Sequence, residues 1–276
     1  MKQLYKRTGG VLLFILLMTA ILALGCSSDS SSDDSGSGGN EENVAFNEPL
    51  TLEAIEAGSI TIDHPWSTLK FTKNGGELEA CAGEEHEIIV AAGDKICFYA
   101  ENSESMSDDS SYMRIDSSND SYIYGNIMSL VTLESGTTDA SKWNPNETVL
   151  TTNKAFYYLF QANSHIKNHS TKKLHLPAIT LTECCYKGMF ISCSALTTAP
   201  VLPATTLVSD CYNNMFYNCQ NLNYIKCLAT NVSGTQYTDL WLGSVASSGT
   251  FVKAAGTTWS TGSDGIPSGW TVQEAN

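Results

Sequence analysis

Residues 202–222 read LPATTLVSDCYNNMFYNCQNL, and residues 176–196 read LPAITLTECCYKGMFISCSAL. The Leu-Pro-Ala, Cys-Tyr, Met-Phe, Cys and Leu positions coincide at an offset of 26 residues. A chain with such a repeat buries its apolar positions between one unit and the next. Asn213 and Asn214 match no apolar position, so we expect them to tolerate substitution by Ser. The predicted repeat core consists of Leu176, Cys185, Met189, Phe190, Cys193, Leu196, Leu202, Cys211, Met215, Phe216, Cys219, Leu222 and Ile225.

Weaker copies flank this pair of units. Three core positions recur 26 residues further on, at Leu228, Trp241 and Phe251, and Phe160 belongs to an earlier unit with four extra residues. Within a unit, the segment Phe-x-x-Cys-x-x-Leu is predicted to run from a short helix, round a corner, into a short strand.

The pattern L-P-A-T-T-L-x-x-x-C-Y-x-x-M-F-x-x-C-x-x-L resembles the BspA-like leucine-rich-repeat surface lipoproteins of bacteria, with F-x-x-C-x-x-L as its specific part. The tail at residues 249–272 resembles the end cap of lipoproteins that carry these repeats. The resemblance covers roughly residues 151–272. It implies a solenoid displayed at the cell surface, in a family with members that bind host matrix proteins or mediate adhesion. Two good repeats would make only a small binding face.

The N-terminus has the composition of a secretory signal. Lys2, Lys6 and Arg7 precede an uncharged apolar run at residues 11–24, which is short for a membrane span and typical of a signal peptide. The run ends at Ala-Leu-Gly-Cys26, which resembles a bacterial lipobox and implies lipid attachment at Cys26. The alternative is an ordinary cleaved signal with a stray cysteine.

A polar tether follows at residues 27–43, with five acids and no base. Such a composition cannot bury apolar surface. Acids at this place resemble the surface-export signal of lipoproteins in anaerobic Gram-negative gut bacteria, although a plain linker has the same composition. We therefore expect a protein anchored in the outer membrane and facing outside.

Charge divides the remaining chain. Of 29 acidic and 15 basic residues in all, 19 and 5 fall in residues 44–150, and 5 and 7 fall in residues 151–276. The net charge of -14 argues against a nucleic-acid partner, because phosphate binding needs a basic face. The change of charge predicts a change of module.

The acidic half is predicted to be β-rich. Residues 59–62 alternate, Asn74-Gly75 is typical of a hairpin turn, and a second hairpin is expected around residues 92–94. Residues 101–121 are predicted to be an exposed loop.

The predicted fold class is therefore mostly β with short helices (α+β), with a β-sandwich-like N-terminal module followed by a short leucine-rich-repeat-like solenoid of 26-residue repeats. The expected parts are a signal peptide (1–25), a tether (26–43), a β-rich module (44–150), a solenoid (151–252) and a C-terminal cap (253–276).

Nine cysteines are present. Those inside the repeats are expected to be buried thiols that behave as small apolar residues. Disulfides between neighbouring units remain an alternative, because adjacent strands lie at a distance that a disulfide tolerates. A bridge between Cys81 and Cys97 is a further possibility. No Cys-x-x-Cys pair indicates zinc.

Three other groups of residues were weighed as sites. His165, His169 and His175 are expected in a surface loop rather than around a metal. The run from Asp116 to Asp120 lacks the glycine and glutamate of an EF-hand, and a looser calcium site there is an alternative. Five tyrosines offer either a sugar-stacking platform or half-buried strand positions; they are Tyr112, Tyr122, Tyr124, Tyr157 and Tyr158.

No motif of a hydrolase, a phosphate loop or a zinc protease occurs. We expect no catalytic residue, no metal site and no cofactor. The function expected from these observations is a lipid-anchored surface protein that binds proteins or mediates adhesion through its repeats. The alternative is glycan binding in support of polysaccharide capture.

Overall fold

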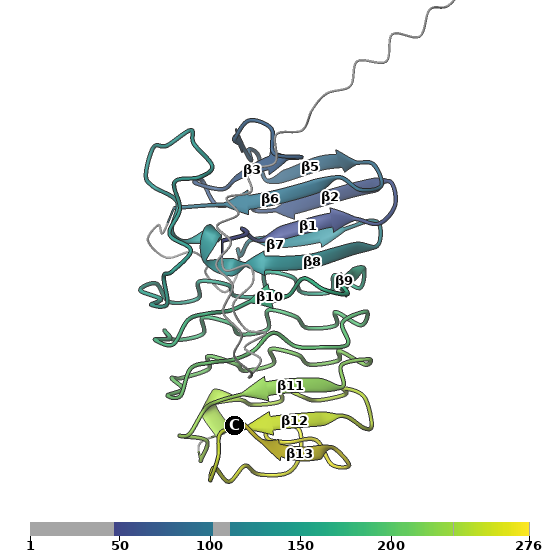
Figure 1. The fold of residues 1–276 in the computed structure, drawn as a ribbon, viewed down its shortest axis with the longest axis vertical. Helices are drawn as coiled ribbons and strands as arrows, with labels where there is room; N and C mark the ends of the chain where they lie inside the picture. The colour runs from purple at the N-terminus through teal and green to yellow at the C-terminus, as the bar shows by residue number, and fades with distance from the viewer. Residues whose placement is uncertain (1–46, 102–110, 234, 276) are drawn as a thin grey trace, which may run out of the picture. The chain divides into compact units, whose positions relative to one another are not determined.

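The computed structural model describes residues 47–101, 111–233 and 235–275, which belong to one compact unit, Glu42–Asn276 (Figure 1). The signal peptide, Cys26 and the acidic tether lie outside the described residues. Within the described part of the chain, no helix is long and apolar enough to cross a bilayer.

The strands of the described residues form three sheets. The largest has the order β10-β8-β1-β6-β3-β4, with β9 also paired to β8; a second has the order β5-β2-β7, and the third has the order β11-β12-β13. The strands are β1 (Thr51–Ala54), β2 (Gly58–Asp63), β3 (Lys70–Lys73), β4 (Glu79–Ala80), β5 (Glu85–Val90), β6 (Lys95–Tyr99), β7 (Arg114–Ser117), β8 (Ser121–Asn126), β9 (Ile166–Asn168), β10 (Leu174–His175), β11 (Tyr224–Cys227), β12 (Thr250–Lys253) and β13 (Thr271–Glu274).

The turn chemistry of the first half explains part of this arrangement. The hairpin at Asn74-Gly75 is confirmed: both residues have left-handed backbones, and β3 pairs antiparallel with β4. The second predicted hairpin is wrong, because β5 pairs with β2 whereas β6 pairs with β1 and β3. The loop predicted at residues 101–121 is wrong in part, since β7 lies within it and buries Ile115 against the core.

The predicted fold class is wrong in its second half. The described residues contain no α-helix, only the 3-10 helices η1 (Ile127–Leu130) and η2 (Thr235–Tyr237). The strands of the described residues form several small sheets, and none of these sheets is closed or forms a solenoid. The short helices expected at Phe-x-x-Cys-x-x-Leu are replaced by runs of turns at residues 153–162, 183–192, 209–218 and 238–244, which we call the turn segments.

Left-handed residues explain why these segments are not helical. In the second turn segment Cys184, Gly188 and Ser192 have positive φ values of 56°, 64° and 61°, so every fourth residue has a left-handed backbone conformation. A helix of L-residues cannot continue through such positions. The following segment repeats the pattern at Asp210, Asn214 and Asn218.

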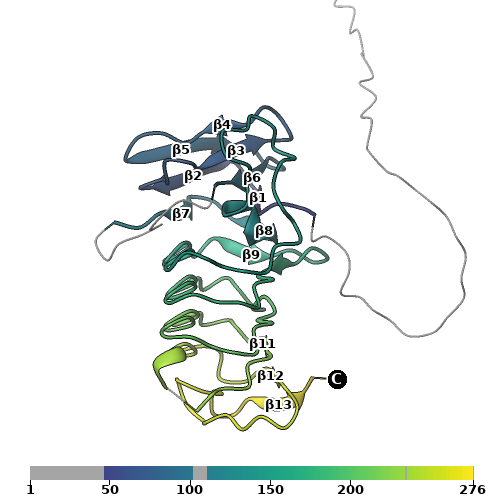
Figure 2. The same ribbon diagram turned by 90° about the vertical axis from the view of Figure 1, so that its left-hand side faces the viewer.

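Backbone hydrogen bonds join the turn segments to one another. In residues 184–192, the N–H groups of even-numbered residues donate to carbonyls of the next segment, as Gly188 does to Asn213 at 2.9 Å and Phe190 to Met215 at 2.9 Å. Odd-numbered residues donate three positions back, as Met189 does to Tyr186 at 3.2 Å. Every N–H of residues 184–192 therefore has a partner, and five of these nine partners lie in the neighbouring segment. In Figure 2 the segments appear one below the other along one edge of the ribbon.

The side chains between the segments form one continuous core with the first half. Phe160, Phe190 and Phe216 stack at centroid distances of 5.6 and 5.5 Å. Trp241 occupies the place of Met215, as predicted, because the Phe216 N–H donates to its carbonyl just as Phe190 does to Met215. Ile225 pairs with Phe251, as predicted.

One predicted match is wrong by a residue. Leu202 forms a bridge with Cys227 rather than with Leu228, and Cys227 is the buried one of the two.

Asn213 is 7% exposed and donates a side-chain hydrogen bond to Asp210, and Asn214 has a left-handed φ of 54°. Both asparagines therefore have a structural role that the repeat alignment did not show.

Candidate functional site

The outer side of the turn segments is the first candidate for a binding surface, and we call it the turn face. The hydrogen-bond register brings Tyr158, Gly188, Asn214 and Leu240 into one row across the four segments. A second row consists of Gln161, Ile191, Tyr217 and Gly243. Tyr217 and Leu240 are the large apolar side chains of these rows that are exposed, at 37% and 40%.

Two glycines hold tyrosine rings on this face. A Cβ atom at Gly188 would lie 2.0 Å from Cε1 of Tyr158, and one at Gly243 would lie 2.8 Å from Cδ2 of Tyr217. Each ring therefore packs directly on the backbone of the next segment, where only glycine leaves room for it. This packing restricts the motion of the rings, so less entropy is lost when a partner binds them.

The turn face also carries charged groups of both signs and uncharged polar groups. Lys187 lies 3.9 Å from Asp210, and the Asn218 amide donates to the Ser192 hydroxyl at 3.0 Å. Tyrosine, asparagine and serine side chains together with a few aliphatic ones are typical of adaptable protein-binding surfaces.

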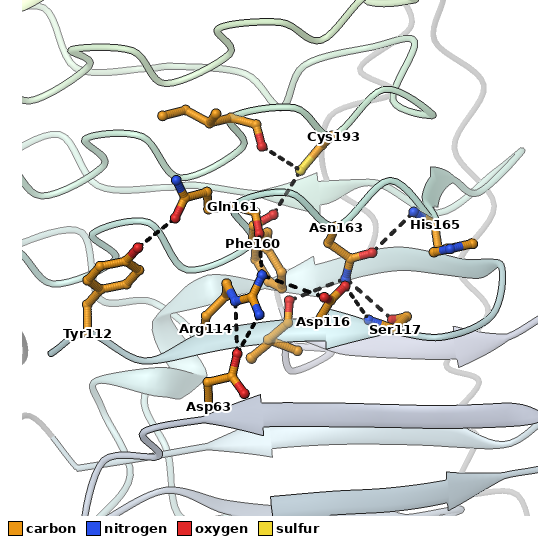
Figure 3. A network of polar contacts seen from close by, with 12 residues as sticks. Asp63, Tyr112, Arg114, Asp116, Ser117, Phe160, Gln161, Asn163, His165 and Cys193 are labelled. Carbon is orange, nitrogen blue, oxygen red and sulfur yellow. Dashed lines mark hydrogen bonds and ion pairs between the residues drawn. The ribbon is translucent and has the colours of Figure 1, made fainter. Parts of the chain in front are cut away.

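The network in Figure 3 fixes the first turn segment to β7. Arg114 donates through Nε and Nη2 to Asp63 Oδ2 at 2.9 and 2.6 Å, and its Nη1 donates to the Gln161 carbonyl at 3.5 Å. Tyr112 donates its hydroxyl to the Gln161 side chain at 2.7 Å. The fully buried Asn163 donates to the Ile115 carbonyl at 3.3 Å. The network positions the end of the turn face.

The five tyrosines proposed as a platform fall into two separate clusters. Tyr112, Tyr157 and Tyr158 pack on one another at centroid distances of 4.3 to 5.6 Å, with Lys154 5.3 Å from the Tyr157 ring centre. Tyr157 is buried, so this cluster offers little open ring surface.

The other two tyrosines lie against a histidine. Tyr122 and Tyr124 meet His169 edge-on at 4.9 and 5.6 Å, and Lys172 lies over the Tyr124 ring at 4.1 Å. The tyrosines therefore do not form one flat surface for a sugar.

The thirteen residues predicted as repeat core are all buried, each at 5% exposure or less. The eight cysteines of the described residues, Cys81 and Cys97 among them, are free thiols. Cys193 donates its thiol hydrogen to the Phe160 carbonyl at 3.0 Å, and Cys219 does so to Phe190 at 2.9 Å. Burial raises the pKa of Cys219 to about 12, so this thiol is protonated and unreactive at neutral pH.

The histidines considered as metal ligands do not come together at one site. His165 lies 3.3 Å from Asp120, which also pairs with Lys167, and His169 accepts hydrogen bonds from two backbone N–H groups. Burial lowers the pKa of His175. No group of three or more His, Cys, Asp or Glu side chains is placed to hold a metal ion within residues 47–101, 111–233 and 235–275.

A feature that the sequence did not indicate lies at the C-terminal end. Residues of β12, β13 and the loop that connects them line an open hollow of about 460 Å³, with Trp259 and Trp270 among them. The tryptophans were visible in the sequence, but nothing in their spacing predicts a hollow.

No protein-family model, no curated protein and no solved structure matches this chain.

Proposed function

We propose that the chain is a non-catalytic, lipid-anchored binding protein of the bacterial surface, and that its turn face contacts a protein partner. The observation that carries this proposal is the pair of tyrosine rings held on Gly188 and Gly243, beside the exposed Leu240. Rings with restricted motion and surrounding amides supply contact area and hydrogen bonds at low entropic cost. The resemblance of residues 202–222 to BspA-like surface proteins supports the same function.

The anchor is tested at Cys26. Conversion to a diacylated cysteine would hold the chain in the outer membrane, because several acyl chains make anchoring stable. Cys26→Ala should move the protein from the membrane fraction to the soluble fraction. A variant that stays in the membrane and is cleaved at the same bond would contradict the lipid anchor.

Protein binding is tested with the full chain against immobilised extracellular-matrix proteins. Tyr217→Ser should weaken binding at least tenfold, because it removes an aromatic side chain from the centre of the turn face. Ile179→Ser is the matched control, since Ile179 is 55% exposed but lies outside the turn segments. Equal binding by both variants and the parent would exclude the turn face.

Glycan binding in support of polysaccharide capture is the second candidate. The tyrosine clusters support it poorly, because their rings pack on one another or on His169. The observation that favours it is the tryptophan-lined hollow at the C-terminal end.

A further inference from the structure

We infer that the hollow lined mainly by the loop that connects β12 to β13 is a binding site for a neutral sugar unit of a glycan. This inference rests on the glycan-binding candidate and not on protein binding by the turn face. The hollow has about 460 Å³, within the usual range of about 300–1,000 Å³ for small-ligand sites. Its lining includes Lys253, Thr258, Trp259, Thr261, Ser268 and Trp270.

Aromatic rings form the firm part of the site. Trp259 stacks on the fully buried Trp241, with 5.3 Å between centroids and 12° between planes, and Phe251 meets Trp259 edge-on at 5.3 Å. The ring is thus held by neighbours that cannot move without opening the core. A partly buried tryptophan fixed in this way offers the apolar surface on which the C–H face of a sugar ring packs.

The indole N–H groups show that hydrogen bonding here is incomplete. Trp241 donates to the Gly265 carbonyl at 3.0 Å and Trp270 to the Ala246 carbonyl at 2.8 Å. The Trp259 N–H is buried and has no hydrogen-bond partner. Native proteins seldom leave such a donor unpaired, and here it belongs to the ring that lines the hollow.

Hydroxyl groups surround the aromatic part. Thr258, Thr261 and Ser268 are exposed members of the lining, and the backbone of Gly265 packs on Ser260 so closely that an added Cβ would lie 2.1 Å from its carbonyl oxygen. This contact holds the loop that carries the hydroxyls. A combination of an aromatic wall with neutral hydroxyls at the rim suits a polyol ligand that stacks on one side and forms hydrogen bonds around its edge.

Charge indicates a neutral ligand. Lys253 is the only charged residue of the lining, and its Nζ lies 2.8 Å from Glu274 Oε1. The same carboxylate oxygen accepts the Gly256 N–H at 3.1 Å. An anionic sugar would have to compete with Glu274 for this ammonium group, whereas a neutral sugar would not.

The test measures retardation of the full chain in gels that contain soluble polysaccharides. The neutral probes are starch, mannan and arabinoxylan, and polygalacturonate is the anionic probe. We expect retardation by at least one neutral polysaccharide, none by polygalacturonate, and at least a tenfold weaker affinity for Trp259→Ala. Trp143→Ala is the matched control, because Trp143 is a half-buried tryptophan outside the hollow.

Trp259→Ala also removes a stacking partner of Trp241, so a second variant keeps the test valid if it unfolds. Ser268→Arg places a long charged side chain at an exposed rim position and should abolish retardation with an unchanged melting temperature. Quenching of tryptophan fluorescence by oligosaccharides from the retarding polysaccharide should disappear with it.

The outcomes separate the two levels of the proposal. Retardation that persists in Ser268→Arg and Trp259→Ala would overturn the hollow as the site and leave glycan binding in place. No retardation by any of the four polysaccharides would overturn both the hollow as the site and glycan binding, without bearing on the matrix-protein experiment. Retardation by polygalacturonate alone would overturn the neutral ligand.

Discussion

The rings of Phe190 and Phe216 are parallel, with 2° between their planes and 5.5 Å between their centroids. Phe160 continues the stack at 5.6 Å from Phe190. The three residues hold the same place in consecutive turn segments, and Phe190 and Phe216 are fully buried. The Phe190 ring therefore packs between the ring of the unit before it and the ring of the unit after it.

Truncation of Phe216 should be strongly destabilising. Phe216→Ala removes a ring at 0% exposure that contacts neighbouring units, and such changes cost about 3–5 kcal/mol. That is a large part of the stability of an ordinary domain. Urea unfolding followed by circular dichroism measures the loss. Gln220→Ala, at an exposed position four residues away, is the control and should stay within about 0.5 kcal/mol; similar losses in the two variants would contradict the stacked arrangement.

The repeat allowed the buried positions to be predicted, but not the local backbone. An offset of 26 residues identifies which side chains are equivalent, and the thirteen residues predicted as repeat core are all buried, although Leu228 of the weaker copy is not. The spacing Phe-x-x-Cys-x-x-Leu fits a helix as well as it fits successive turns, since both return a side chain to one side every three or four residues. The sequence feature that distinguishes turns from a helix is the residue type at two repeat positions: Gly188 is equivalent to Asn214, and Ser192 is equivalent to Asn218. Glycine and asparagine adopt left-handed backbones readily, and all four have positive φ.

Other features that the sequence did not predict depend on contacts between segments far apart in the chain. The second hairpin failed because β5 and β6 join different sheets, which depends on partners far away in the sequence. A local contact accounts for another: Asn213 is buried and donates its amide hydrogen to Asp210 within the same turn segment, which a repeat of apolar residues does not indicate. The C-terminal hollow requires Trp259 and Trp270 to approach through a loop without regular structure, and no periodicity indicates such an approach.

Substitution of Gly188 should show the tight packing of the turn face. Gly188→Ala places a Cβ 2.0 Å from the Tyr158 ring at a residue with φ of +64°. We expect a loss of about 2–4 kcal/mol, from the left-handed backbone and from the displaced ring together. Gly136→Ala is the matched control, because Gly136 has a φ of +72° and no atom within 4 Å of the added Cβ.

Gly136→Ala measures the loss of stability from the left-handed backbone alone, which should be about 1 kcal/mol. Denaturant midpoints of the two variants give the difference directly. Equal losses would mean that the Tyr158 ring moves aside without cost, and the turn face would then be less rigid than we propose.

Removal of the Tyr186 hydroxyl should not destabilise the chain. This oxygen is buried in a side chain at 1% exposure and has no hydrogen-bond partner. Tyr186→Phe should therefore be neutral or raise stability by up to about 1 kcal/mol, because an unpaired buried polar group is unfavourable. Tyr124→Phe provides the contrast, since the Tyr124 hydroxyl donates to Glu53 at 2.6 Å and its loss should cost about 1–3 kcal/mol. Thermal melts of both variants decide the matter; destabilisation by Tyr186→Phe would show that its hydroxyl has a partner in solution.

The buried thiols make stability depend on pH in the alkaline range. Burial raises the pKa of Cys219 and of Cys227 to about 12, from the value of 9.0 that an exposed thiol has. The unfolded chain therefore loses these protons near pH 9, whereas the folded chain retains them. The stabilisation is complete below pH 9 and falls between pH 9 and about 12, by about 1.4 kcal/mol per pH unit for each thiol.

Urea midpoints at pH 8 and pH 10 test this dependence. The parent should be less stable at pH 10, and Cys219→Ala should lose less stability between the two pH values, because it lacks one of the groups that titrate on unfolding. Its own cost, from a small cavity and the lost contact with the Phe190 carbonyl, is the same at both pH values and cancels in the difference. A variant with the same pH dependence as the parent would show that the Cys219 thiol already ionises in the folded protein, and its place in the core between two turn segments would then be wrong.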